Sequence, residues 1–136
     1  MRAAVRSGFT LIEMMMVLAI AAILAAISYP SYMDFVRQGW RGEGRAALMR
    51  QMQEQERHFT LAGHYRQYEG DSGDGGAGGK YTLQSGHCEG AATVRTCVRL
   101  TATLKPQWSD PEAGNLWIDS TGNKGCDGNR PSRCWQ

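Results

Sequence analysis

Cysteine and histidine are the residue types in this chain with the most reactive side chains. The four cysteines, Cys88, Cys97, Cys126 and Cys134, all lie in the second half of the 136-residue sequence. Their spacing does not match the paired ligands of a zinc ribbon. An even number of cysteines at such spacings predicts disulfide bonds formed in an oxidising compartment.

The three histidines, His58, His64 and His87, are scattered, and none has a second metal ligand at a familiar spacing. Catalysis needs an acid, a base or a nucleophile brought to one point, and the sequence offers no such grouping. The sequence therefore predicts a non-catalytic protein without a metal or a cofactor.

Glu13 is conspicuous because it stands at the start of an apolar segment. Residues 14–27 carry no charge, and residues 9–27 are long enough to cross a bilayer as a helix. A carboxylate costs ~2–3 kcal/mol at the centre of such a helix, so it indicates a function and argues against a secretory signal peptide. Arg2 and Arg6 precede the segment and favour a cytoplasmic location for its start.

Five cations form a candidate ligand patch. Arg95 and Arg99 are expected on the solvent face of one strand, and Lys124, Arg130 and Arg133 around a C-terminal loop. Such groups could hold the phosphates of DNA. The net charge of the whole chain adds little attraction for DNA. The chain has 15 Lys and Arg against 13 Asp and Glu, and two of these cations precede the apolar segment. Solvated roles, or salt bridges to neighbouring chains, are therefore favoured over DNA docking.

The residues around Glu13 resemble the start of a type IV pilin. The sequence GFTLIE at 8–13 precedes the apolar segment, and YPSY at 29–32 follows it. The stretch 114–124 and the closing Cys134-Trp135 resemble the tail of PilE-like minor pilins. The resemblance thus covers both ends of the chain.

This resemblance implies roles for four residues. A prepilin peptidase would remove the leader 1–8 by cutting between Gly8 and Phe9, and would methylate the new amino terminus of Phe9. Glu13 would pair with the Phe9 amino group of a neighbouring subunit. A buried carboxylate beside an ammonium is tolerated where either alone is penalised, so the pair would set axial register. Pro30 would end the membrane helix or mark where it kinks in the filament.

A long helix must carry and position these residues. Gly39, Gly42 and Gly44 interrupt it, each weakening it by ~1 kcal/mol relative to alanine, and Gly63 predicts its end. Apolar residues recur at spacings that predict one helical face over a sheet: Tyr32, Phe35, Val36, Leu48, Met49, Met52 and Phe59.

The remaining sequence predicts a loop and a few strands. Residues 69–79 are rich in glycine and aspartate and predict a flexible loop, whose Asp71 and Asp74 lack the spacing of a calcium-binding EF-hand. Alternation predicts strands near 81–83, over 94–104 and at 116–118.

The predicted fold class is α+β, with a long N-terminal α-helix packed on a small antiparallel sheet of three or four strands, as in type IV pilins. The leader 1–8 would be followed by a hydrophobic transmembrane and filament-core helix, 9–30, and by a head, 31–136, with a C-terminal disulfide loop.

The resemblance also bears on the disulfide pairing. In PilE-like relatives a cysteine often precedes the strand that corresponds to 116–118, and here Glu112 and Ala113 occupy that place. Cys126 would take over as the partner of Cys134, and Cys88 would pair with Cys97. This local pairing is favoured over the two crossed alternatives.

Taken together, the residues and the resemblance predict a minor type IV pilin, a structural subunit that primes or joins the filament in adhesion and twitching motility. Its implied partners are other pilin subunits, the prepilin peptidase, the inner membrane and its pilus assembly platform. The chain would first span the inner membrane of a Gram-negative bacterium once, with its head in the periplasm, and then join an extracellular filament. The alternatives are a type II secretion pseudopilin and a pilus-borne receptor for DNA or a host surface.

Overall fold

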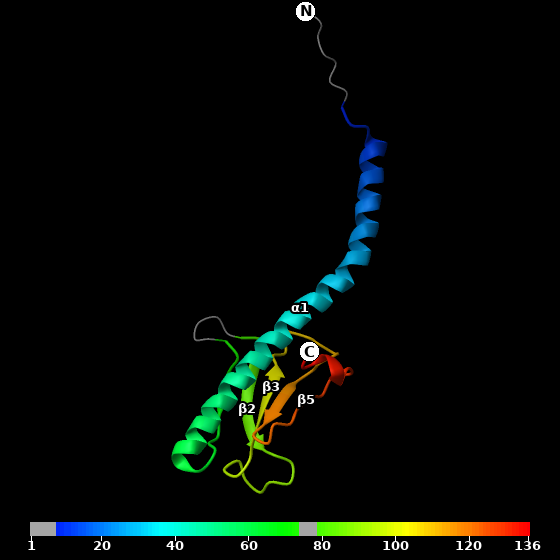
Figure 1. Ribbon diagram of the computed structural model, residues 1–136. Helices are drawn as coiled ribbons and strands as arrows, with labels where there is room; N and C mark the ends of the chain where they lie inside the picture. The colour runs from blue at the N-terminus through cyan, green and yellow to red at the C-terminus, as the bar shows by residue number, and fades with distance from the viewer. Residues whose placement is uncertain (1–7, 74–78) are drawn as a thin grey trace, which may run out of the picture. The chain divides into compact units, whose positions relative to one another are not determined.

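The computed structural model describes residues 8–73 and 79–136. Most of the predicted leader, and Asp74 of the predicted loop, lie outside the described residues. The chain forms two compact units, Met1–Val36 and Arg37–Gln136. One helix, α1, spans Leu11–Ala62 and so contributes to both (Figure 1).

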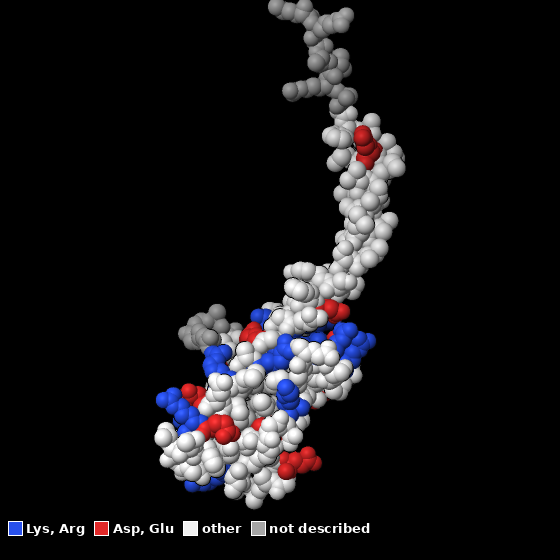
Figure 2. Space-filling view, viewed as in Figure 1, with Lys and Arg blue, Asp and Glu red and all other residues white. Residues whose placement is uncertain are grey.

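The first unit consists of the apolar part of α1. In this part of the helix the large apolar side chains are exposed, including Leu11 at 80% and Ile27 at 69%. Figure 2 shows a stem that is white along most of its length, with acidic atoms near its start. Within the described residues, α1 is the one helix long and apolar enough to cross a membrane, with a mean hydropathy of 2.4 in its most apolar window. Pro30 does not end this helix, which continues to Ala62.

The second unit contains the rest of α1 and a five-stranded sheet. The strands are β1 (Glu69–Asp71), β2 (Tyr81–His87), β3 (Val98–Leu104), β4 (Leu116–Asp119) and β5 (Lys124–Cys126), followed by a short 3-10 helix, η1 (Pro131–Arg133). Each strand pairs antiparallel with its neighbour in the chain, in the order β1-β2-β3-β4-β5 (Figure 1). The predicted α+β fold is therefore confirmed.

Two features of the sheet differ from the sequence prediction. The sheet has five strands, where three or four were predicted, because its edge strands β1 and β5 are only three residues long and are too short to show alternation. β1 lies in the segment that was predicted to be wholly loop. β3 begins at Val98, not at 94, because the chain turns from Thr93 to Thr96, where the Thr96 amide donates to the Thr93 carbonyl at 3.4 Å.

The core lies between α1 and the inner face of the sheet. The helix contributes Ala47, Leu48 and Met52, as predicted for the last two, and Gly44 is buried against the sheet. A Cβ atom at Gly44 would lie 3.0 Å from side-chain atoms of both Tyr81 and Leu116. This glycine thus allows close packing, rather than merely weakening the helix.

Five residues of the predicted helical face do not belong to the core: Tyr32, Phe35, Val36, Met49 and Phe59. Tyr32 and Phe35 are 65% and 73% exposed, and Met49 and Phe59 are 53% and 38% exposed. The helix buries a narrower face than its apolar residues suggested, because polar and small residues share that face with Leu48 and Met52. The sheet contributes the larger part of the core: Tyr81, Leu83, Val98, Leu100, Ala102 and Leu116.

The two disulfides are local. Cys88 bonds to Cys97 across the loop between β2 and β3, with Cα atoms 5.5 Å apart. Cys126, at the end of β5, bonds to Cys134 just after η1, with Cα atoms 6.2 Å apart. Each bond closes a small loop and leaves no described cysteine free.

Candidate assembly and ligand-binding sites

The start of α1 carries the residues predicted to act in assembly. The Glu13 amide donates to Oγ1 of Thr10 at 3.3 Å, and the Thr10 amide donates to Oε2 of Glu13 at 3.4 Å. This reciprocal pair is a capping box, which satisfies two backbone N–H groups at the helix start. In a single chain the Glu13 carboxylate therefore contacts its own backbone. Its pairing with Phe9 of a neighbouring subunit stays a prediction.

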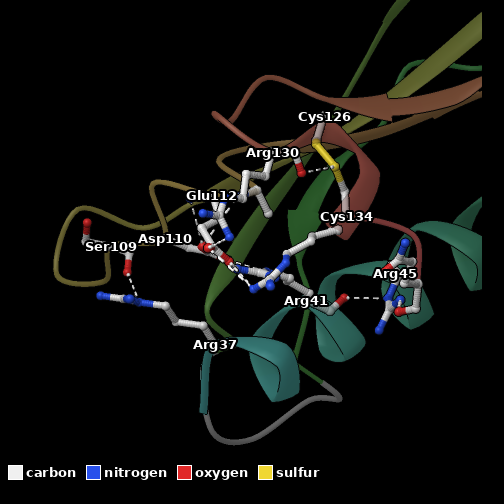
Figure 3. A network of polar contacts seen from close by, with 12 residues as sticks. Arg37, Arg41, Arg45, Ser109, Asp110, Glu112, Cys126, Arg130 and Cys134 are labelled. Carbon is white, nitrogen blue, oxygen red and sulfur yellow. Dashed lines mark hydrogen bonds and ion pairs between the residues drawn. A yellow bond between two sulfur atoms is a disulfide. The ribbon is translucent and has the colours of Figure 1, made fainter. Parts of the chain in front are cut away.

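Arg41 forms a buried ion pair that the sequence did not suggest. Its Nε and Nη2 donate to the two carboxylate oxygens of Asp110 at 2.6 and 2.8 Å (Figure 3). The two side chains are only 3% and 0% exposed. Asp110 also accepts the backbone N–H groups of Glu112 and Ala113 at 3.2 and 3.3 Å. The connection between β3 and β4 is thereby fixed to α1.

The electrostatics of this pair follow from its geometry. The Asp110 hydrogen bond is the largest cause of a raised pKa for the Arg41 guanidinium. Burial alone would raise the pKa of Asp110, but the hydrogen bonds and charge of Arg41 outweigh it and leave that pKa below its usual value. Both groups therefore stay charged over the neutral range.

Glu112 extends the network to the C-terminal loop. It accepts from Nη2 of Arg41 at 3.1 Å, and Arg130 and Arg133 each approach it to 3.2 Å. The hydrogen bond from Arg41 is the largest cause of a lowered pKa for Glu112. Figure 3 shows Arg41, Glu112 and Arg130 close together, near the disulfide between Cys126 and Cys134. Arg130 and Arg133, two cations of the predicted ligand patch, thus form ion pairs within the molecule.

Two further cations of that patch lie over tryptophan rings. The Arg99 guanidinium lies 4.2 Å from the centre of the Trp117 ring and 3.4 Å from an Asp119 oxygen. Lys124 lies 5.2 Å from the centre of the Trp135 ring. Such cation–π contacts fix the cations on the protein surface.

Arg95, the fifth cation, lies apart from the other four. It belongs to the disulfide loop, not to β3, and its side chain is exposed. The five predicted residues therefore fall into three environments: the Glu112 network, the tryptophan contacts and the groove beside Arg95.

The groove beside Arg95 has a volume of about 580 Å³. The groove is lined by the connection after α1, residues 64–67, by the loop segment 92–95 and by His87. The Tyr65 amide donates to the Arg95 carbonyl at 3.1 Å and joins the first two of these segments. Arg66 and Arg95 are both exposed, and among the described residues neither guanidinium has a carboxylate partner. The groove thus presents two exposed cations beside an aromatic side chain.

Sequence reasoning had not grouped the residues of this groove. Arg66 stands between Tyr65 and Tyr68, and a cation among aromatic residues is the signal that could have drawn attention to it. Its proximity to Arg95 depends on how the chain returns through β2, which no local pattern contains.

The base of the glycine-rich loop is closed by protein contacts. Oδ1 of Asp71 accepts the amides of Gly73 and Gly79, and Oδ2 bonds to Lys105. The Lys105 hydrogen bond is the largest cause of a lowered pKa for Asp71. Within the described residues no group of three or more His, Cys, Asp or Glu is arranged to hold a metal ion.

Comparison with known proteins agrees with these observations. Residues 4–29 match the model described as "Prokaryotic N-terminal methylation motif". A solved structure of a type IV pilin from Shewanella oneidensis has the same fold, with a TM-score of 0.52 and 24% sequence identity over 73% of this chain and 97% of that one. A membrane-length helix that starts in this motif and continues over an antiparallel sheet defines a type IV pilin.

The head identifies the family more narrowly. Residues 30–116, more than half of the chain, match the family model described as "Type IV minor pilin ComP, DNA uptake sequence receptor". The chain belongs to this family, and it is a structural subunit of a type IV pilus.

The curated relatives resemble this chain only over a short segment. The fimbrial protein EcpC of Eikenella corrodens is 54% identical over 39 residues, which cover 29% of this chain and 26% of the relative. The type IV major fimbrial protein FimA of Dichelobacter nodosus is 49% identical over 39 residues, 29% of this chain and 24% of the relative. The chain thus spans about a quarter of the length of the curated relatives it matches.

Proposed function

We propose that this minor pilin is a DNA receptor on the pilus, and that DNA binds at the groove between residues 64–67 and 92–95. The observation that carries the proposal is the pair of exposed guanidiniums, Arg66 and Arg95, which line one groove and have no carboxylate partner among the residues that the structure describes. The family description supports the choice of DNA as the ligand.

The groove has the chemistry that a DNA backbone requires. Arginine forms strong charge-assisted hydrogen bonds with phosphate oxygens, and each neutralised phosphate releases condensed counterions. The disulfide between Cys88 and Cys97 closes the loop that carries Arg95, so this loop is preorganised before binding. Arg130 and Arg133, by contrast, would have to leave Glu112 before they could bind phosphate.

A binding titration tests this site. The full chain in detergent is titrated into a labelled DNA duplex at several salt concentrations, and the anisotropy is measured. Arg66→Gln with Arg95→Gln is expected to weaken binding by about tenfold or more and to reduce the salt slope by about 2. Arg130→Gln is the matched control, because this exposed cation already contacts Glu112. Equal affinity and salt slope for the double variant and the wild type would refute the site.

For assembly, we propose the route that the N-terminal motif supports. A prepilin peptidase removes residues 1–8 and methylates Phe9. The chain then stays anchored in the inner membrane with its head in the periplasm. The assembly platform then transfers it into the filament, where Glu13 sets register against the Phe9 amino group of a neighbour. The match of residues 4–29 to the methylation motif supports this route.

Intact mass spectrometry of sheared filaments tests the route. The expected subunit is a minor component that lacks residues 1–8 and carries one methyl group on Phe9. A chain absent from filaments but abundant in the inner membrane would instead support the pseudopilin alternative.

A further inference from the structure

Two of the three histidines line the proposed DNA groove and the third contacts one of them, although they come from three different segments. His64 and His87 line the groove. His58 lies on α1, and its ring meets that of His64 edge-on, with ring centres 5.2 Å apart. The sequence places no other histidine anywhere in the chain.

The hydrogen bonds of two rings define where a proton can be added. Nδ1 of His64 lies 2.9 Å from the Ala62 carbonyl, and Nδ1 of His58 lies 2.9 Å from the His64 carbonyl. A carbonyl oxygen only accepts, so each Nδ1 carries a hydrogen and donates. Nε2 is then the site of protonation in both rings. Each ring can gain a charge without losing its hydrogen bond.

Among the described residues, the charged and titratable side chains that line the groove, or that contact one of its lining side chains, are Glu56, His58, His64, Tyr65, Arg66, His87 and Arg95. Tyr65 adds a hydroxyl that donates to Glu56 at 2.9 Å, and burial raises the pKa of Tyr65, so this group stays neutral. A phosphate bound in the groove favours a positive charge on the side chains beside it. DNA binding and proton uptake at the groove are therefore coupled.

We propose that acidification strengthens DNA binding at this groove, because protonation of His64 and His87 adds two positive charges to the groove that Arg66 and Arg95 also line. The proposal rests on the proposed function and assigns a regulation to the same site. Histidine is the side chain whose charge ordinarily changes between about pH 5 and 8. Mildly acidic surroundings would then favour DNA capture, and alkaline surroundings its release.

The test measures the dissociation constant of the DNA complex at pH 8.5 and at pH 6.0. The ratio of the first value to the second reports how strongly acidification strengthens binding. The full chain in detergent is titrated into the same labelled duplex at constant ionic strength. Each added charge in an exposed groove changes affinity by about threefold, so the wild type is expected to bind about tenfold more tightly at pH 6.0. The salt slope should also be steeper at pH 6.0, by up to about 2.

Three variants separate this regulation from other effects of pH. His64→Gln with His87→Gln is expected to bring the ratio near 1. His64→Lys with His87→Lys, which keeps the charge at both pH values, should bind tightly and also give a ratio near 1. Arg130→Gln is the control, because Arg130 contacts Glu112 and does not line the groove, and it should keep most of the wild-type ratio.

The possible outcomes distinguish the two proposals. If the wild type binds DNA but its two dissociation constants are nearly equal, the proposed pH regulation is overturned and the DNA receptor proposal is not. The same holds if the double glutamine variant keeps the wild-type ratio. A folded wild type that binds the duplex at neither pH overturns the DNA receptor proposal and the regulation with it.

Discussion

Replacing Asp110 with asparagine is expected to destabilise the head strongly, because Arg41 would keep its buried charge without its main partner. Removing one member of a buried ion pair costs about 3–5 kcal/mol. Glu112 still contacts Nη2 of Arg41 at 3.1 Å, so the lower end applies, about 3 kcal/mol. A domain of this size loses roughly 4–8 °C in melting temperature per kcal/mol, which predicts a fall of about 12–24 °C.

The assay is thermal unfolding of the full chain in detergent, followed by near-ultraviolet circular dichroism. Glu54→Gln, an exposed carboxylate on the same helix, is the control and should change the midpoint little. The double variant Arg41→Met with Asp110→Leu should recover much of the loss, since a buried pair can be replaced by apolar packing. A fall of less than about 5 °C for Asp110→Asn would refute the claim that this pair holds α1 to the sheet.

The same pair predicts how stability depends on pH. The pKa of Asp110 in the folded chain lies below its usual value because of Arg41, so the unfolded chain takes up this proton first as the pH falls. Its stabilisation is therefore complete above the unfolded pKa of about 3.9 and is lost as the pH falls through the lower, folded value. Asp110→Asn should flatten the acid limb of the stability curve, which urea unfolding between pH 2 and 6 would measure.

Three further substitutions test the packing of the head. Gly44→Leu should destabilise it by more than about 2 kcal/mol in urea unfolding, whereas Gly39→Leu, where a Cβ meets nothing within 4 Å, should not. Cys126→Ser with Cys134→Ser should cost about 2.5 kcal/mol in the same measurement, the loop-closure value for a sequence separation of 8. Tyr81→Phe should be neutral or stabilise by up to about 1 kcal/mol, because the buried Tyr81 hydroxyl has no hydrogen-bond partner among the described residues.

The sequence predicted those features of the fold that leave a local signal. Gly63, with a φ of 71°, ends α1 as its residue type indicated, and β2 and β4 begin within two residues of their predicted starts. The disulfide pairing that the resemblance implied, Cys88 to Cys97 and Cys126 to Cys134, is the one that the structure contains. Turn chemistry and alternation act over a few residues, so they can be read without knowing the rest of the chain.

The contacts that define the sites leave no such signal. Arg41 and Asp110 are 69 residues apart in sequence, and nothing in their local patterns indicates that they meet. Arg95 was placed on a strand because alternation continued through 94–97, whereas the chain turns there and places its side chain at the groove with Arg66. Which charges pair, and which remain available to a ligand, is decided by tertiary structure.

The order of the strands has a consequence for how quickly the head can fold. Each strand pairs with the next one along the chain, so the sheet can extend one hairpin at a time as the polypeptide emerges. Contacts that are close in sequence form fast, because little loop entropy is lost in closing them. Each disulfide also joins cysteines nine residues apart or fewer, so nearby thiols meet first and scrambled pairings have little opportunity to form. The slow step is then expected to be the docking of the finished sheet onto α1, when Asp110 reaches Arg41.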